Sequence, residues 1–145
     1  MGVVGAGDSG ARLAAEAEAV GAALARRGAV VVSGGLGGVM EAACRGAKGA
    51  GGSTLGILPG GDRSAANEWV DLALATGLGE ARNALVVRAC DALVAVGGGY
   101  GTLSEIALAL KAGRPVFGLE SWDIPGVVGV ASPEEAATAA LEVLT

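Results

Sequence analysis

The stretch ALVAVGGGYGTLSE, residues 92–105, decides how this chain folds. It begins with five apolar residues, continues with four glycines within residues 97–101, and ends in residues that favour a helix. A continuous apolar run is typical of a strand that is buried on both faces. Glycine lets the backbone turn tightly and approach its neighbours closely. The stretch therefore predicts a strand, a tight turn and a helix in succession.

The same alternation of apolar runs and helical segments continues along all 145 residues. Helices that connect successive strands are typical of a parallel sheet. The last helix has a clear beginning, because Ser132-Pro133-Glu134-Glu135 combines a capping box with proline at the first helical position. The predicted strands are 1–4, 29–32, 54–58, 70–75, 92–96, 115–119 and 127–130, and the predicted helices are 11–27, 39–50, 80–89, 102–112 and 133–144.

The fold class that follows is α/β. We expect a single doubly wound, Rossmann-like domain over residues 1–145, with a mostly parallel sheet covered by helices on both faces. In such a fold the carboxyl ends of the strands and the amino ends of the following helices lie along one edge, where ligands bind. The loops expected at this edge are 5–10, 33–38, 59–67, 76–80 and 97–102.

The composition excludes several classes of function. The chain has no histidine, which excludes a histidine-ligated metal, a Ser-His-Asp triad and a Cys-His pair within one chain, and we expect no metal site. The net charge is −5 and only four residues are aromatic, so we expect no nucleic-acid partner. No uncharged stretch exceeds 13 residues, against about 18 for a membrane span. We therefore expect a cytoplasmic protein without a membrane partner, with buried free thiols at Cys44 and Cys90.

Two glycine-rich turns at the expected edge are candidates for an anion site, because free backbone amides at a helix start attract negative charge. We name them the 33–38 turn and the 97–102 turn. In the latter, Thr102 can also donate its hydroxyl to a phosphate. A flexible turn without a ligand is the alternative for the former. The proposed phosphate- or ligand-binding residues are Gly34, Gly35, Gly37, Gly38, Gly98, Gly99, Tyr100, Gly101 and Thr102.

Arg82 and Glu105 are the charged residues that we expect near the 97–102 turn. Arg82 lies in the first turn of a predicted helix, where a cation is unfavourable towards the helix dipole and therefore suggests an anionic partner. A pair with Glu80, or exposure to solvent, is the alternative. Glu105 also has two interpretations, because Thr102-Leu103-Ser104-Glu105 fits a capping box in which the carboxylate bonds the Thr102 amide.

Residues 5–10, GAGDSG, match the dinucleotide fingerprint G-x-G-x-x-G after a strand and before a helix. The acidic residue that should follow about 20 positions further on is missing, and Ser33 ends the second strand instead. An NAD site is therefore not expected. A tight turn that borders another phosphate site is the favoured interpretation.

The segments GGLGGVMEAACRGAK, ILPG, GLGEARN and GGGYGTLSE, in this order and spacing, resemble the Lonely Guy (LOG)-like, or lysine decarboxylase-like, superfamily. The similarity covers residues 1–119. This superfamily contains cytokinin-activating phosphoribohydrolases and molybdenum-cofactor carrier proteins. Its members are usually dimers or tetramers, so the resemblance implies a homodimer or homotetramer.

The hydrolase branch carries the motif P-G-G-x-G-T-x-x-E and an upstream Arg-Lys pair. In that branch the arginine and the glutamate act in cleaving a nucleoside 5′-monophosphate to free base and ribose 5-phosphate. The resemblance places the glutamate of this motif on Glu105 and the arginine on Arg82, and so implies that these two are the candidate catalytic residues. The glycines and Thr102 would hold the phosphate. Two residues depart from that branch, since Gly97 stands in place of proline and Asn83 in place of lysine. Both departures look closer to the cofactor-carrier-like branch.

The resemblance thus implies binding of a phosphorylated nucleotide or pterin-type ligand, as in a cofactor carrier. A nucleoside 5′-monophosphate phosphoribohydrolase is the alternative, and an oligomeric protein whose glycines serve packing alone is a third. No cofactor is required for any of them. The expected bound ligand is a nucleoside monophosphate or a molybdopterin-type compound.

Overall fold

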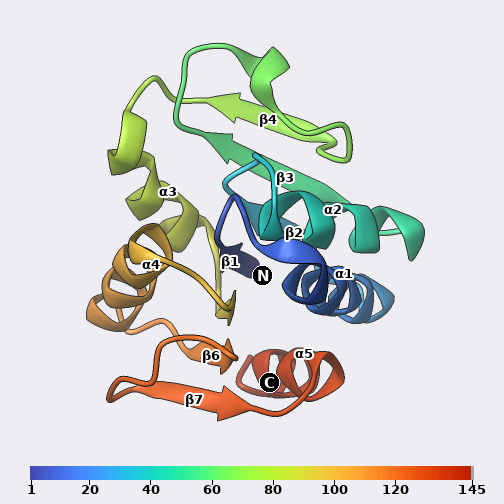
Figure 1. The fold of residues 1–145 in the computed structure, drawn as a ribbon, viewed down its shortest axis with the longest axis vertical. Coiled ribbons are helices and arrows are strands. Elements are labelled where there is room, and N and C mark those ends of the chain that lie inside the picture. The colour runs from blue at the N-terminus through green and yellow to red at the C-terminus, as the bar shows by residue number, and fades with distance from the viewer. Residues whose placement is uncertain (145) are drawn as a thin grey trace.

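The computed structural model describes residues 1–144, which form a seven-stranded sheet between two layers of helices (Figure 1). The strands are β1 (Gly2–Gly5), β2 (Val31–Ser33), β3 (Thr54–Leu58), β4 (Leu72–Ala75), β5 (Leu93–Val96), β6 (Val116–Leu119) and β7 (Val127–Val130). The helices are α1 (Gly10–Arg26), α2 (Val39–Gly49), α3 (Arg82–Ala89), α4 (Tyr100–Lys111) and α5 (Pro133–Glu142), with short 3-10 turns η1 (Arg63–Ala65) and η2 (Gly79–Ala81). The predicted α/β fold class is confirmed.

The strands follow the order β4-β3-β2-β1-β5-β6-β7, and every neighbouring pair is parallel. The chain therefore builds one half of the sheet outward from β1 to β4, and the other half from β5 to β7. At the junction of β1 and β5 the next helices leave on opposite faces, α1 on one and α4 on the other (Figure 1). Open α/β sheets bind ligands in the crevice at such a junction.

Apolar residues are buried on both faces of the sheet, as the continuous apolar runs predict. In β1, Val3 packs with α1, α2 and α5, while the next residue, Val4, packs with α3 and α4. All four residues of β5 are buried. The central strands can therefore consist of valine, alanine and leucine throughout, because neither face meets water.

Two helical glycines let α1 and α2 pack in direct backbone contact. A Cβ added at Gly21 would lie 2.0 Å from the carbonyl oxygen of Ala43, and one added at Gly46 would lie 1.9 Å from that of Glu18. Any side chain at these two positions would force the helices apart. Part of the high glycine content is thus explained by helix packing rather than by turns.

The beginning of α4 differs from the prediction. The helix begins at Tyr100 rather than at Thr102, because Gly99 is the N-cap residue and its carbonyl accepts a hydrogen bond from the Leu103 amide at 3.0 Å. Thr102 is therefore the third residue of the helix and not its cap. This moves Glu105 out of the capping position that the local sequence also allowed.

Other boundaries also shift, and two of them have a clear local description. The strand predicted at residue 70 begins at Leu72, because the Val70 amide bonds the Asn67 carbonyl in a turn at 3.2 Å. The first residues of the helix predicted from residue 80 form η2, and α3 begins at Arg82. The predicted start of the last helix is confirmed, since the Ser132 hydroxyl accepts a hydrogen bond from the Glu135 amide at 3.1 Å.

Cys44 and Cys90 are both buried with free thiols, as predicted. Burial raises the pKa of each thiol, that of Cys90 to about 11. Among residues 1–144, no helix combines the length and the apolar character that crossing a membrane requires.

Candidate functional site

A cavity of about 480 Å³ lies at the carboxyl edge of the sheet, where β1 and β5 end. This volume is within the range of small-molecule sites. Four of the five loops expected at this edge contribute to it, and the 33–38 turn does not. The lining residues are Gly5, Ala6, Gly7, Met40, Pro59, Gly79, Glu80, Arg82, Asn83, Gly99, Gly101, Thr102 and Glu105.

The 97–102 turn forms one wall of this cavity. Gly97 and Gly98 have φ angles of +56° and +116°, which residues with side chains rarely adopt. A Cβ added at Gly98 would lie 2.4 Å from Cβ of Thr102, so the turn is also tightly closed against its own helix. Gly99, Gly101 and Thr102 line the cavity. The amides in the first turn of a helix have no acceptor within it and are available to a ligand.

The carbonyl groups of this turn are held by the loop after β6. The Ser121 hydroxyl donates to the Gly97 carbonyl at 2.6 Å, and the Trp122 indole nitrogen donates to the Gly99 carbonyl at 3.1 Å. The turn is thus oriented through its carbonyl groups, and the amides in the first turn of α4 have no acceptor within the helix. Such an arrangement suits an anion.

Arg82 is the first residue of α3, and its side chain lines the cavity while only 9% of the residue is exposed. One guanidinium nitrogen donates to Oδ1 of Asn83 at 2.6 Å, and Nε has no hydrogen-bond partner among residues 1–144. Burial lowers the pKa of Arg82, and the charge of Glu105 opposes this effect. The alternative pair with Glu80 is wrong, because the ion pairs of the described residues do not include it.

Arg82 also explains a glycine of the 33–38 turn. A Cβ added at Gly34 would lie 2.8 Å from both terminal nitrogens of Arg82 and 2.7 Å from the sulfur of Met40. The absence of a side chain at this position gives the guanidinium room to pack against the backbone. Gly34 therefore contacts the site through Arg82 and is not itself part of the cavity lining.

Glu105 lies in the second turn of α4 with only 6% of the residue exposed, and it lines the same cavity as Arg82. Burial raises the pKa of Glu105 to about 7, although the positive charge of Arg82 lowers it. No ion pair within 4.0 Å joins the two side chains in the described part of the chain. The capping interpretation of Glu105 is wrong, because Gly99 caps α4 with its backbone. The carboxyl group is thus left to face the cavity.

The space next to the 33–38 turn is occupied by other atoms of the protein. The Val39 amide at the start of α2 donates to the Ala6 carbonyl at 3.1 Å, and a Cβ added at Gly38 would lie 2.3 Å from that oxygen. The Gly35 amide donates to the Ser33 hydroxyl at 3.1 Å. Of the residues proposed in this turn, none lines the cavity.

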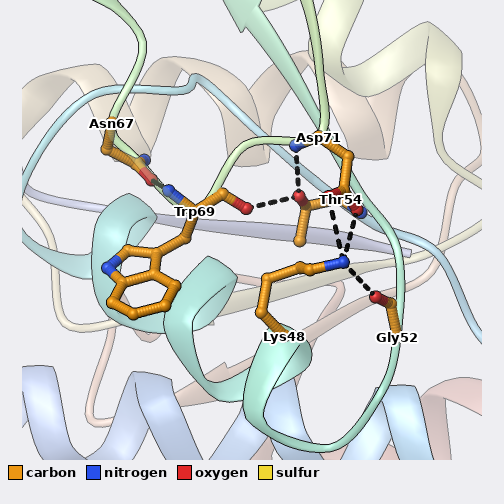
Figure 2. Close-up of polar contacts among 6 residues, drawn as sticks. All are labelled: Lys48, Gly52, Thr54, Asn67, Trp69 and Asp71. Atoms are coloured by element: carbon orange, nitrogen blue, oxygen red, sulfur yellow. Dashed lines mark hydrogen bonds and ion pairs between the residues drawn. The ribbon is translucent and has the colours of Figure 1, made fainter.

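Asn67 closes the outer side of the same turn. Its amide donates to the Gly35 carbonyl at 2.9 Å, and its side-chain nitrogen donates to the Leu36 carbonyl, also at 2.9 Å. Its side-chain oxygen accepts a hydrogen bond from the Trp69 amide at 3.0 Å (Figure 2). Asn67 therefore joins the loop between β3 and β4 to the loop between β2 and α2.

The far end of the β3–β4 loop is held by a second polar cluster, which Figure 2 shows. The Thr54 hydroxyl donates to the Trp69 carbonyl at 2.6 Å and accepts from the Asp71 amide at 2.8 Å. The Asp71 carboxylate accepts hydrogen bonds from the Thr54 amide and the Lys48 ammonium group, both at 2.9 Å. Hydrogen bonding with Lys48 is the main reason why the pKa of Asp71 is lowered. This cluster anchors a long connection that has no α-helix of its own.

Sequence reasoning missed part of the cavity wall. Gly5, Ala6 and Gly7 line it, although the fingerprint they belong to was assigned only a bordering role. Asn83 was noted as a departure from a family motif but not as a site residue. The signal that could have found all of these is their position at the carboxyl edge of the sheet. Further missed lining residues are Met40, Pro59, Gly79 and Glu80.

Comparison with known proteins agrees with this architecture. The molybdenum cofactor binding protein from the phototrophic bacterium Rippkaea orientalis superposes with a TM-score of 0.94 at 38% identity, covering 99% of this chain and 96% of that chain. The Moco carrier protein from Chlamydomonas reinhardtii superposes with a TM-score of 0.90 at 37% identity, covering 99% and 95%. An uncharacterised protein from Archaeoglobus fulgidus is 46% identical over 137 residues, covering 94% of this chain and 90% of that protein.

These similarities confirm the predicted resemblance to LOG-like proteins of the cofactor-carrier kind. They support the binding of a small molecule at a general level. The model of the SLOG cluster4 family matches residues 1–143, and the chain therefore belongs to the SLOG cluster4 family.

Proposed function

We propose that the cavity binds a phosphorylated nucleotide or pterin-type ligand and that the protein acts as a carrier for it. The observation that carries this proposal is the buried guanidinium of Arg82, which lines the cavity and has no partner for its Nε. A buried cation without a paired anion is unfavourable, and an anionic group in the cavity compensates for it. The amides at the start of α4 supply further donors to the same group.

Glu105 makes the proposed binding depend on pH. Because its pKa is about 7, the carboxyl group is largely protonated in mildly acidic solution and ionised in mildly alkaline solution. The ionised form repels a phosphate, whereas the protonated form can donate a hydrogen bond to it. A phosphate monoester itself takes up a proton at about pH 6, so the effect of Glu105 is expected between about pH 6 and 8, where binding should weaken as the pH rises.

Two residues favour carriage over hydrolysis. Gly97 has a φ of +56°. The hydrolase motif has proline at this position, and proline requires a φ of about −65°. The turn thus has a backbone conformation that the hydrolase motif does not allow. Asn83 stands in place of the hydrolase lysine and binds Arg82 through its side-chain oxygen at 2.6 Å. Since the solved structures at 37% and 38% identity are molybdenum cofactor carrier and binding proteins, a molybdopterin-type compound is the proposed cargo.

Glu105 is the observation that favours the second candidate, a nucleoside 5′-monophosphate phosphoribohydrolase. Cleavage of an N-glycosidic bond passes through an oxocarbenium-like transition state, which a nearby carboxylate stabilises. A buried carboxyl group in a cavity, with a pKa raised to about 7, is typical of a catalytic acid or base. In this reading Arg82 binds the phosphate or steadies the leaving base.

Two measurements test the carrier proposal. Mass spectrometry of small molecules released from the purified protein by denaturation should identify a phosphorylated compound. Calorimetric titration with GMP should show saturable binding, weakened at least about tenfold by Arg82→Gln, because a hydrogen bond to a charged group contributes about 1.5–3 kcal/mol. Arg88→Gln is the matched control, since Arg88 lies on the same helix and is exposed. Absence of both a co-purified ligand and GMP binding would contradict the proposal.

Turnover separates the two candidates. Incubation of the protein with AMP and with GMP should release no ribose 5-phosphate if it is a carrier. Release that disappears in Glu105→Gln, with GMP binding retained, would establish the hydrolase instead.

The oligomeric state stays a prediction. A homodimer or homotetramer is expected, and light scattering of the purified protein measures it directly.

A further inference from the structure

Tyr100 is unusual because it exposes an aromatic ring in a chain that has only four aromatic residues. The residue is 84% exposed, more than any other large apolar or aromatic residue of the described chain. It is the first residue of α4 and belongs to the 97–102 turn. An exposed aromatic ring next to a cavity offers a flat face on which a planar ligand can stack.

The ring of Tyr100 is supported by a second aromatic ring. It stacks on Trp122 with ring centroids 6.1 Å apart and planes inclined by 27°. Trp122 is in turn held by the hydrogen bond from its indole nitrogen to the Gly99 carbonyl at 3.1 Å. Because most of Tyr100 is nevertheless exposed, much of the surface of a positioned ring stays open.

A second hollow of about 550 Å³ lies beside this ring. It shares Glu80, Asn83 and Gly101 with the cavity that contains Arg82, so the two hollows adjoin. Its other lining residues are Ala81, Ala84, Tyr100, Ser104 and Leu108. The hollow therefore combines an aromatic side chain, small apolar side chains and a few polar groups, which suits a flat heterocycle.

Polar groups in the second hollow are already oriented by one another. The side-chain nitrogen of Asn83 donates to the Ser104 hydroxyl at 3.0 Å, and that hydroxyl donates to the Gly101 carbonyl at 2.7 Å. The side-chain oxygen of Asn83 accepts from Arg82 in the first cavity. Asn83 thus connects the two hollows and fixes the side chains between them.

We propose that Tyr100 is the stacking face for a flat heteroaromatic ring whose attached phosphate lies in the cavity beside Arg82. This inference rests on the proposed function and adds the ring to it. The ligand class is a ring linked to a phosphate, with the ring against Tyr100 and its polar edge towards Ser104 and Asn83. GMP is a suitable probe, because guanine and pterin share the same amino-pyrimidinone edge.

The test compares GMP with ribose 5-phosphate, which has the phosphate but no ring, in calorimetric titrations of the full chain. GMP should bind more tightly than ribose 5-phosphate to the unchanged protein. Tyr100→Ala should weaken GMP binding about tenfold, since stacking on an aromatic side chain contributes about 1–3 kcal/mol per base. The same variant should leave ribose 5-phosphate binding unchanged. Tyr100→Phe keeps the ring and should retain both affinities, which makes it the matched control.

Three outcomes overturn the inference in distinguishable ways. If Tyr100→Ala leaves GMP binding unchanged, or weakens both ligands equally, stacking on Tyr100 is refuted while the phosphate site stands. If ribose 5-phosphate binds the unchanged protein as tightly as GMP, the ring has no site. If neither ligand binds, this inference fails, and the proposed function fails with it when no phosphorylated compound co-purifies with the protein. Circular dichroism confirms that Tyr100→Ala is folded, which is expected for a residue that is 84% exposed.

Discussion

The 33–38 turn and the 97–102 turn have similar sequences and opposite environments. Each follows a buried strand and contains four glycines; the first ends just before α2, and the second runs into the first turn of α4. In the first turn, a Cβ added at Gly38 would lie 2.3 Å from the carbonyl oxygen of Ala6. In the second, a Cβ added at Gly99 or Gly101 would meet nothing within 4 Å. One turn is packed shut and the other borders a cavity.

The difference shows that glycine content alone does not make an anion site. The amide at the start of α2 already has the Ala6 carbonyl as its acceptor. Around the 97–102 turn, Ser121 and Trp122 bind carbonyl oxygens, and the amides in the first turn of α4 have no acceptor within the helix. What matters is whether the protein has already used the donors that a ligand needs. Five substitutions should break or sharpen this contrast.

Gly38→Ala should have the largest effect. The added methyl group meets the Ala6 carbonyl, and the residue has a φ of +63°, so we expect a loss of about 3 kcal/mol or more of unfolding free energy. Urea unfolding measures it. Gly37→Ala is the matched control in the same turn, because its nearest neighbour would be 3.6 Å away. Equal stability of the two variants would show that the 33–38 turn is not packed shut.

Glu105→Gln tests the cavity that the 97–102 turn borders. The carboxyl group has a pKa of about 7 in the folded protein against the ordinary 4.5, so the folded state holds its proton over this pH range while the unfolded state releases it. Stability should therefore fall as the pH rises from about 4.5 to 7, by about 3 kcal/mol in total. Glu105→Gln should abolish this loss and be more stable than the unchanged protein at pH 8.

Unfolding at a series of pH values checks this prediction. Glu80→Gln serves as the control, because Glu80 lines the same cavity but is exposed. A change within about 0.5 kcal/mol is expected there. If the two glutamine variants had the same pH profile, the carboxyl group of Glu105 would not be desolvated as the structure indicates.

Asn67→Ala and Ser121→Ala form a pair of intermediate effect. Asn67→Ala removes the side-chain bonds to Leu36 and Trp69, and we expect a loss of about 1–2 kcal/mol with GMP binding unchanged. Ser121→Ala removes the hydrogen bond to the Gly97 carbonyl and should cost about 1 kcal/mol. Since it loosens the turn that borders the cavity, it should also weaken GMP binding. If Asn67→Ala weakened GMP binding and Ser121→Ala did not, the 33–38 turn rather than the 97–102 turn would border the ligand.

Gly101→Ala should have the smallest effect on stability. The position is helical and its Cβ would meet no atom within 4 Å, so unfolding free energy should stay the same or rise by up to about 1 kcal/mol. Because Gly101 lines the cavity, the methyl group should nevertheless weaken GMP binding. A variant that is stable and binds GMP normally would show that this side of the turn does not contact the ligand.

The sequence predicted every strand and helix, because each rests on local patterns that tertiary contacts reinforce. The Ser132 cap and the buried run of β5 are examples. The start of α4 was predicted wrongly, since a Thr-x-x-Glu pattern suggested a side-chain cap where the Gly99 backbone serves instead. Propensity alone cannot tell these two apart, because both are locally favourable.

The site was predicted in part for a similar reason. Arg82 and Glu105 line one cavity, as their places at the sheet edge suggested. The glycines of the 33–38 turn were proposed as ligand-binding and instead contact Ala6, Asn67 and Arg82. These partners come from other loops, and no pattern within residues 33–38 identifies them.

The sequence by itself determined the alternation of strands and helices, and with it the edge along which polar and glycine-rich loops gather. Those features follow from side-chain hydrophobicity and backbone freedom, which are local properties. Only the tertiary structure decided which glycine turn stays open. The sequence shows where a glycine leaves space next to the backbone. Whether other backbone, a guanidinium group or a ligand fills that space depends on the segments that the fold brings there.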